Sequence, residues 1–114
     1  MNRIRGDKLR GHLETMVLSV LERGDAHGLE IIRRLEEAGC GLLRLKEGSL
    51  YPALYRLEAV GKVAVVREEP QSARRGAPRR IYRLTSKGKR DLVKARQEWA
   101  SFVQIVGAIV GATA

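Results

Sequence analysis

The segment GSLYPALYRLE (residues 48–58) combines apolar residues at helical spacing with side chains that donate hydrogen bonds. Hydroxyl and guanidinium groups within two turns of one helix suit contacts to phosphate oxygens and to the edges of nucleic-acid bases. The residues that carry this chemistry are Ser49, Tyr51, Tyr55 and Arg56.

A second group of donors lies in PQSARRGAPRR (residues 70–80), which contains four arginines and no acidic residue. Gly76 and Pro78 mark a turn, and strand-like patterns flank the segment. Arginines held at the tip of a hairpin neutralise phosphate groups, whereas the alternative interpretation is a charge run exposed to solvent. The four arginines are Arg74, Arg75, Arg79 and Arg80.

The charge of the whole chain points to the same partner. With 114 residues the chain is long enough for one small domain with a modest core. Its 22 Lys and Arg outnumber its 13 Asp and Glu, which gives a net charge of +9 and a pI near 10.4. A polyanion is the natural partner, with nucleic acid ahead of an acidic membrane or an acidic protein.

Catalytic and metal-binding patterns are missing from the sequence. No nucleophile is paired with a general base by a recognisable spacing, and no glycine-rich phosphate loop follows a strand. Cys40 is the only cysteine, and His12 and His27 are the only histidines, too few ligands for a metal site. We therefore predict a cytoplasmic, metal-free protein that is not an enzyme and uses no cofactor. Cys40 is interpreted as a small apolar residue, with a reactive thiol as the alternative.

Neither end of the chain predicts a signal or a membrane anchor. The first residues, MNRIRGDKLRG, alternate charges with little apolar content, so we expect a loose arm rather than a secretory signal. The tail SFVQIVGAIVGATA is apolar over only 14 residues. A membrane helix needs about 20 apolar residues, so we predict no membrane partner.

Apolar spacing predicts two helices before the tyrosine-rich segment. The first begins at Leu9 and ends near Gly24. The second has His27 as its N-cap, and Glu30 three residues later resembles the second half of a capping box.

The third helix is predicted to start at Ser49 as N-cap and to end at Gly61. This start places Pro52 at the third helical position, where its missing N–H would have no partner inside the helix in any case. The segments KVAVVREE (62–69) and RRIYRLT (79–85) then predict two strands that form a hairpin.

A last helix, capped by Thr85 or Ser86, carries apolar residues at sevenfold spacing over nearly three heptads. This pattern is typical of a helix that pairs with a second helix, so we predict a homodimer. The predicted dimerisation residues are Leu92, Ala95, Trp99, Phe102, Val106 and Ile109.

The order of these elements predicts an α+β, mostly α fold, a winged helix-turn-helix domain followed by a long dimerisation helix. The winged domain is assigned to residues 1–85, with a recognition helix at about 49–60 and a wing at about 62–84. Residues 86–114 form the dimerisation helix.

Two alternatives remain open on the residues alone. The rings of Tyr51 and Tyr55 lie one turn apart and would pack against a neighbouring element with only their hydroxyls exposed. A basic winged-helix module would also suit RNA or a protein partner without operator specificity, because fold does not fix function.

Three segments resemble the PadR family of bacterial transcriptional regulators over roughly residues 9 to 110. They are LETMVLSVLERGDAHGLEIIRRLEE, EGSLYPALYRLEAVGKV and RRIYRLTSKGKRDL, in this order. The length and the single last helix resemble the short subfamily. Leu29 departs from the pattern, because the family more often has an aromatic residue after the sequence HG.

The resemblance implies a homodimeric repressor that binds a palindromic operator in double-stranded DNA, while the last helix pairs with that of the partner subunit. It places Ser49, Tyr51, Pro52 and Tyr55 in the recognition helix and Arg74 to Arg80 in the wing.

Some members of the family sense planar drugs or phenolic acids in a cavity at the dimer interface. Trp99 lies at the matching register of the last helix. The resemblance therefore implies a small aromatic effector that contacts Trp99, with simple packing of Trp99 in the dimer seam as the alternative.

Overall fold

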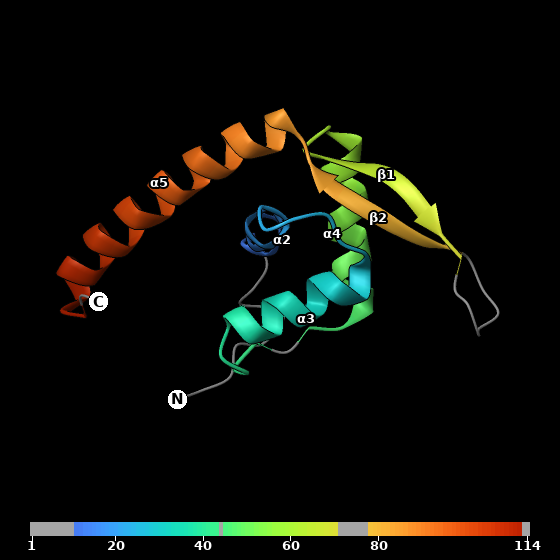
Figure 1. Cartoon of the computed structure of the whole chain (residues 1–114). Coiled ribbons are helices and arrows are strands. Elements are labelled where there is room, and N and C mark those ends of the chain that lie inside the picture. The colour runs from blue at the N-terminus through green and yellow to red at the C-terminus, as the bar shows by residue number, and fades with distance from the viewer. Residues whose placement is uncertain (1–10, 44, 71–77, 113–114) are drawn as a thin grey trace.

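The computed structural model describes residues 11–43, 45–70 and 78–112 of the chain. Three helices pack together, a two-stranded hairpin extends from one side of them, and a long last helix leaves in another direction (Figure 1). This mostly helical α+β arrangement confirms the predicted fold class. The elements are α2 (Leu13–Leu21), α3 (Gly28–Ala38), α4 (Glu47–Ala59), β1 (Val63–Glu69), β2 (Arg79–Leu84) and α5 (Ser86–Val110).

The core lies where α2, α3 and α4 meet. Leu50, Leu54 and Leu57 of α4 are fully buried, together with Val17 of α2 and Ile31 of α3. Each such side chain contributes about 1.5 to 3 kcal/mol when removed from water. Because the apolar residues of α4 recur every three or four positions, their burial fixes which side of α4 faces outward.

The start of α4 differs from the prediction. The helix begins at Glu47 with Lys46 as its N-cap, so Ser49 lies within the first turn and Pro52 lies inside the helix. Pro52 has no N–H to donate to the carbonyl of Gly48, one turn earlier. Gly48 is itself exposed, in the first turn of the helix. The helix thus continues through a proline that the sequence analysis placed near its beginning.

The hairpin is antiparallel and pairs Val63 with Leu84 and Glu69 with Arg79, with an irregularity between Val65 and Arg67. Tyr82 and Leu84 are buried, as the alternation of β2 predicts for its inward face. The predicted wing residues Arg74 and Arg75 lie outside the described residues.

A short bridge ties the hairpin to the loop between α2 and α3. The backbone N–H of Ala26 donates to Tyr82 O at 3.1 Å, and Tyr82 N–H donates to Ala26 O at 2.9 Å. The wing is therefore held to the helical core by backbone hydrogen bonds as well as by burial of Tyr82.

The first turn of α5 is locked to the end of α4. Thr85 Oγ1 accepts from Gly88 N–H at 3.1 Å and donates to Gly61 O at 2.6 Å. A Cβ at Gly88 would lie 2.1 Å from Lys62 O, so the close crossing requires glycine. Lys62 Nζ also pairs with Asp91 at 2.9 Å.

Leu92 does not belong to the dimerisation stripe predicted from the heptad pattern. It is 1% exposed and packs into the core of its own domain, because the first turns of α5 lie against that core. Of the other predicted residues, Ala95 is half-buried, and Trp99, Phe102, Val106 and Ile109 are exposed. Three further apolar residues of α5 are exposed and lie outside the predicted set, namely Val93, Ile105 and Val110.

Among the described residues no helix is long and apolar enough to cross a membrane.

Arg96 holds the middle of α5 against α2, with Nη2 donating to Glu22 Oε1 at 2.8 Å and to Ser19 Oγ at 3.2 Å.

His27 caps α3 as predicted, with Nδ1 accepting from Glu30 N–H at 3.2 Å. The carboxylate of Glu30 instead pairs with Arg33 at 2.6 Å. A cap that accepts through Nδ1 requires this nitrogen to be unprotonated. Partial burial, followed by the positive charge of Arg79, lowers the pKa of His27 below its usual value.

This lowered pKa gives a pH dependence of stability. The unfolded chain binds a proton on His27 at a higher pH than the folded chain, so folding is less stable in acid. We expect the free energy of unfolding to be highest above about pH 6.5 and to decrease as the pH falls through the folded pKa of His27. Chemical denaturation between about pH 5 and pH 8 measures this decrease.

His27→Asn is the matched control, because asparagine caps helices without titrating. It should retain the stability seen at neutral pH and remove the part of the acid decrease that His27 causes. An identical pH profile for the two proteins would contradict the assignment.

Candidate nucleic-acid interface

The outward side of α4 is a narrow face of mostly small residues. Positions spaced by three or four residues lie in line along a helix, and here they are exposed. A face with little side-chain bulk allows the helix backbone to approach another surface closely. The line consists of Gly48, Pro52, Tyr55 and Ala59, with Ser49 and Arg56 beside it.

The two tyrosines of α4 have different environments. Tyr55 is 53% exposed, whereas the ring of Tyr51 is half-buried and packs against the hydrophobic core. Their ring centroids lie 6.4 Å apart. The packing alternative therefore holds for the ring of Tyr51. Burial raises the pKa of Tyr51 above its usual value, so its hydroxyl remains a donor at neutral pH.

Arg56 is on the same side of α4 as Ser49 and reaches toward α2. Its Nε lies 3.7 Å from Glu14 Oε2, and its side chain is 60% exposed. Ion pairs this exposed contribute about 0 to 1 kcal/mol, so this contact is readily exchanged for one with a ligand.

The two described arginines of the predicted wing have different roles in the fold. Arg80 Nη2 donates to both oxygens of Glu58, at 3.1 Å and 3.3 Å, and the guanidinium lies 5.7 Å from the centroid of the Tyr82 ring. It therefore braces the wing against α4. Arg79 is exposed, and it lies three residues before Tyr82, which is bridged to Ala26 just ahead of α3.

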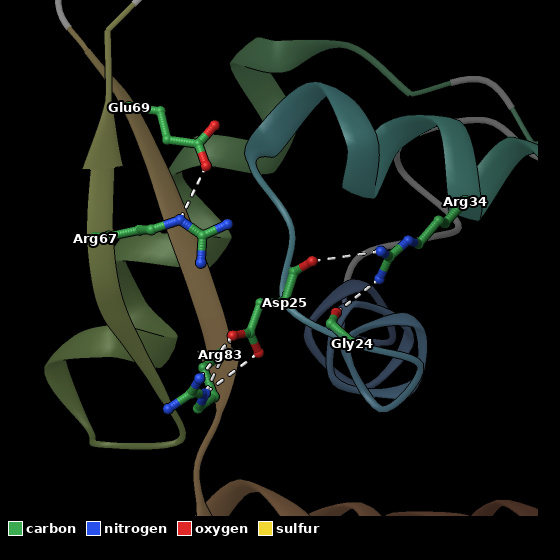
Figure 2. A network of polar contacts seen from close by, with 6 residues as sticks. All are labelled: Gly24, Asp25, Arg34, Arg67, Glu69 and Arg83. Carbon is green, nitrogen blue, oxygen red and sulfur yellow. Dashed lines mark hydrogen bonds and ion pairs between the residues drawn. The ribbon is translucent and has the colours of Figure 1, made fainter.

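A polar network holds the α2–α3 loop between α3 and β2 (Figure 2). Arg34 Nη1 donates to Gly24 O at 2.8 Å and to Val20 O at 3.1 Å. On the other side of the loop, Arg83 Nη2 donates to Asp25 Oδ2 at 2.9 Å. No sequence pattern predicts this network, because its members are spread over the chain and form no motif.

The resulting surface presents hydroxyl and guanidinium donors from α4 and from the loop end of the hairpin, where Arg79 pairs with Glu69. Within the described part of the chain, no cluster of three or more His, Cys, Asp or Glu could hold a metal ion. Donors of this kind bind phosphate oxygens and base edges. The arrangement is that of a helix-turn-helix formed by α3 and α4, with the outward side of α4 exposed, beside a wing.

Comparison with known proteins agrees with this geometry. Residues 17–94 match the model of the transcriptional regulator PadR-like family. The chain is also 32% identical over 103 residues to an uncharacterized protein of Lysinibacillus sphaericus, covering 90% of this chain and 92% of that protein.

Solved structures of transcriptional regulators share the whole architecture. A regulator from Clostridium thermocellum superposes with a TM-score of 0.81 at 29% identity, covering 94% of this chain and 98% of that chain. A PadR family regulator from Clostridium difficile has a TM-score of 0.73 at 31% identity, covering 88% of this chain and 99% of that chain. A PadR family regulator from Eggerthella lenta has a TM-score of 0.76 at 30% identity, covering 91% of this chain and 86% of that chain.

The family match spans more than half of the chain, and the helices, the wing and the long last helix all recur in solved members. The chain therefore belongs to the PadR-like family of DNA-binding transcriptional regulators.

Proposed function

We propose that this regulator is a cytoplasmic homodimeric repressor that binds a palindromic operator and is released by a small aromatic ligand. Membership of a family of transcriptional regulators makes it a DNA-binding protein rather than an enzyme. The observation that carries the proposal is the exposed face of α4 with its donors, beside a hairpin whose strand β2 begins with two arginines.

The major groove is about 12 Å wide and accepts a helix of the diameter of α4. In this proposal Tyr55 and Arg56 reach base edges, because both are exposed near the centre of the helix. In the proposed complex the DNA backbone is contacted by Ser49, Tyr51 and Pro52. The wing contributes phosphate contacts through Arg74, Arg75 and Arg79. Arg80 contributes charge while it holds the wing to Glu58.

A module that binds RNA or a protein without operator specificity is the competing function. The major groove of double-stranded RNA is too deep and narrow for side chains to read, so an exposed recognition helix favours duplex DNA. Selection of tight-binding duplexes from a random pool distinguishes the two functions, since a two-fold regulator enriches a palindrome with half-sites about 34 Å apart.

Substitutions on α4 and on the wing should affect binding differently. Tyr55→Ala and Arg56→Ala should weaken binding to the selected duplex by about 1 to 3 kcal/mol more than binding to random DNA. Arg79→Ala should weaken both and lower the salt slope by about one unit, because it removes a phosphate contact. Titrations of labelled duplex at several salt concentrations measure both quantities.

Arg90→Ala is the matched control, because it removes the same charge from an exposed position on α5. Its effect on affinity should be small. Equal losses on selected and random DNA for the α4 variants would mean that α4 positions the protein without reading bases.

The second half of α5 supports the homodimer. Its exposed apolar side chains include Trp99 at 51%, Phe102 at 55%, Ile105 at 60% and Ile109 at 79%. A row of this kind on a soluble helix marks an interaction surface. A second copy of α5 would cover it and would relate the two recognition helices by a two-fold axis.

Replacing Ile109 by glutamate should convert the dimer to a monomer, because it places a charge in the proposed apolar seam. Gln104→Glu is the control, since Gln104 is exposed on the opposite side of the same helix. Light scattering at micromolar concentration should give the dimer mass for the control and the monomer mass for Ile109→Glu. A monomeric wild-type protein under these conditions would overturn the proposal.

The aromatic residues at the start of this stripe provide the proposed ligand site. The Trp99 ring stacks on Phe102 with centroids 5.7 Å apart and planes at 19°, and His12 meets it edge-on at 5.1 Å. In a dimer, two copies of this half-exposed ring near the axis would form a slot for a planar compound. The ligand acts as an inducer only if it binds the DNA-incompetent dimer more tightly.

Planar aromatic compounds should quench Trp99 fluorescence and release the selected duplex over the same concentration range. Trp99 is the only tryptophan, so its emission reports this site alone. We expect at least one compound to bind with a Kd below about 100 µM, or about −5.5 kcal/mol. If none does, and Trp99→Ala abolishes the dimer, Trp99 is a packing residue of the seam.

A further inference from the structure

Gly28, the first residue of α3, lies against the ring of Tyr51 from α4. A Cβ built on Gly28 would be 2.5 Å from Tyr51 Oη, 2.7 Å from Cζ and 2.9 Å from Cε1. Distances this short do not occur between real atoms, so any side chain at residue 28 must displace something. The backbone of Gly28 is in an ordinary helical conformation. Glycine is thus required for space and not for its conformational freedom.

The ring of Tyr51 is the part that would move. The backbone at Gly28 is held by the cap of His27, and Ile31 N–H donates to His27 O at 3.0 Å. By contrast, the atoms nearest the missing Cβ form the outer end of the Tyr51 ring, which is only partly buried and can change its χ angles. A methyl group at residue 28 should therefore leave the fold intact and displace the Tyr51 hydroxyl.

The position of this hydroxyl matters because of its surroundings. It lies beside the first turn of α3, where the initial N–H groups have no partner inside the helix. Burial and then the charge of Glu47 raise the pKa of Tyr51, while Arg79 lowers it. The Tyr51 hydroxyl and the beginning of α3 lie together, and β2 passes the same place, because Tyr82 is bridged to Ala26 just before α3. In the proposed complex a phosphate of bound DNA would lie here.

We propose that Gly28 is a positioning residue for DNA binding: its missing side chain allows Tyr51 to place its hydroxyl at the beginning of α3, where it donates to a DNA phosphate. This inference rests on the proposed role of Tyr51 at the DNA. It adds Gly28 to the residues required for DNA binding. Gly28 does not contact DNA itself, and it carries no charge or side-chain donor by which it could be identified from the sequence.

A double-mutant cycle on the full-length protein tests the proposal. Tyr51→Ala should lower affinity for duplex DNA about tenfold or more, the loss expected for a hydrogen bond to a charged group. Gly28→Ala should lower affinity by a similar factor while its thermal unfolding midpoint stays close to that of the wild type. Gly28→Ala combined with Tyr51→Ala should bind no more weakly than Tyr51→Ala alone.

Gly39→Ala is the matched control, because a Cβ at Gly39 would lie 2.9 Å from Leu43 Cβ, at the other end of α3. It introduces a comparable steric contact far from Tyr51 and should leave DNA affinity unchanged. If Gly28→Ala does not fold, the double variant decides the matter, since removal of the Tyr51 ring relieves the contact and should restore folding.

The outcomes separate this inference from the proposed function. Unchanged affinity in Tyr51→Ala would refute the role of Tyr51 at the DNA and this inference with it. Weak binding by Tyr51→Ala beside normal binding by Gly28→Ala would refute the positioning role alone. Additive losses, or a double variant that remains unfolded, would show that Gly28 acts independently of Tyr51 and would also overturn it.

Discussion

Burial of one apolar stripe of α4 determines which of its side chains face outward. Leu50, Ala53, Leu54 and Leu57 are each 0% exposed, so a rotation of α4 about its axis would expose several of them. Each buried leucine contributes about 1.5 to 3 kcal/mol, far more than the exposed ion pairs at the helix surface. This burial alone turns the opposite face of α4 toward the solvent, so the residues of that face are not needed to fix the orientation of the helix. Those residues are then available for DNA contacts.

The apolar spacing was sufficient to predict the order of the helices, the hairpin and the outward position of Tyr55, because these features depend on local periodicity. It placed the start of the first helix at Leu9, whereas α2 begins at Leu13 after its N-cap His12. It failed at the beginning of α4, where the rule that proline lies in the first turn placed the cap at Ser49. The structure starts the helix three residues earlier, after Lys46, so Pro52 falls inside it and offers no N–H to the carbonyl of Gly48. Tertiary packing of Leu50 and Leu54 stabilises the helix across this gap.

The contacts that position the wing could not be predicted from sequence. Asp25 and Arg83 are 58 residues apart, and Arg80 pairs with Glu58 across 22 residues. No periodicity relates residues at such separations, and each pair forms only once the core has brought the elements together. The same holds for Leu92, whose heptad position predicts a dimer seam but whose place near the first turn of α5 puts it in the domain core.

The junction between α4 and α5 connects the two proposed functions of the molecule. The first turn of α5 is held to the chain just after α4 by contacts of Thr85 and Lys62. The two segments approach so closely that residue 88 has no room for a side chain. Further along, Arg96 ties α5 to α2. A displacement of the second half of α5 can therefore be accommodated in two ways. Either the helix bends beyond Arg96, or the whole winged domain, with α4, turns together with α5. The second response changes the distance between recognition helices in a dimer, and the fixed junction favours it over a local adjustment of α4.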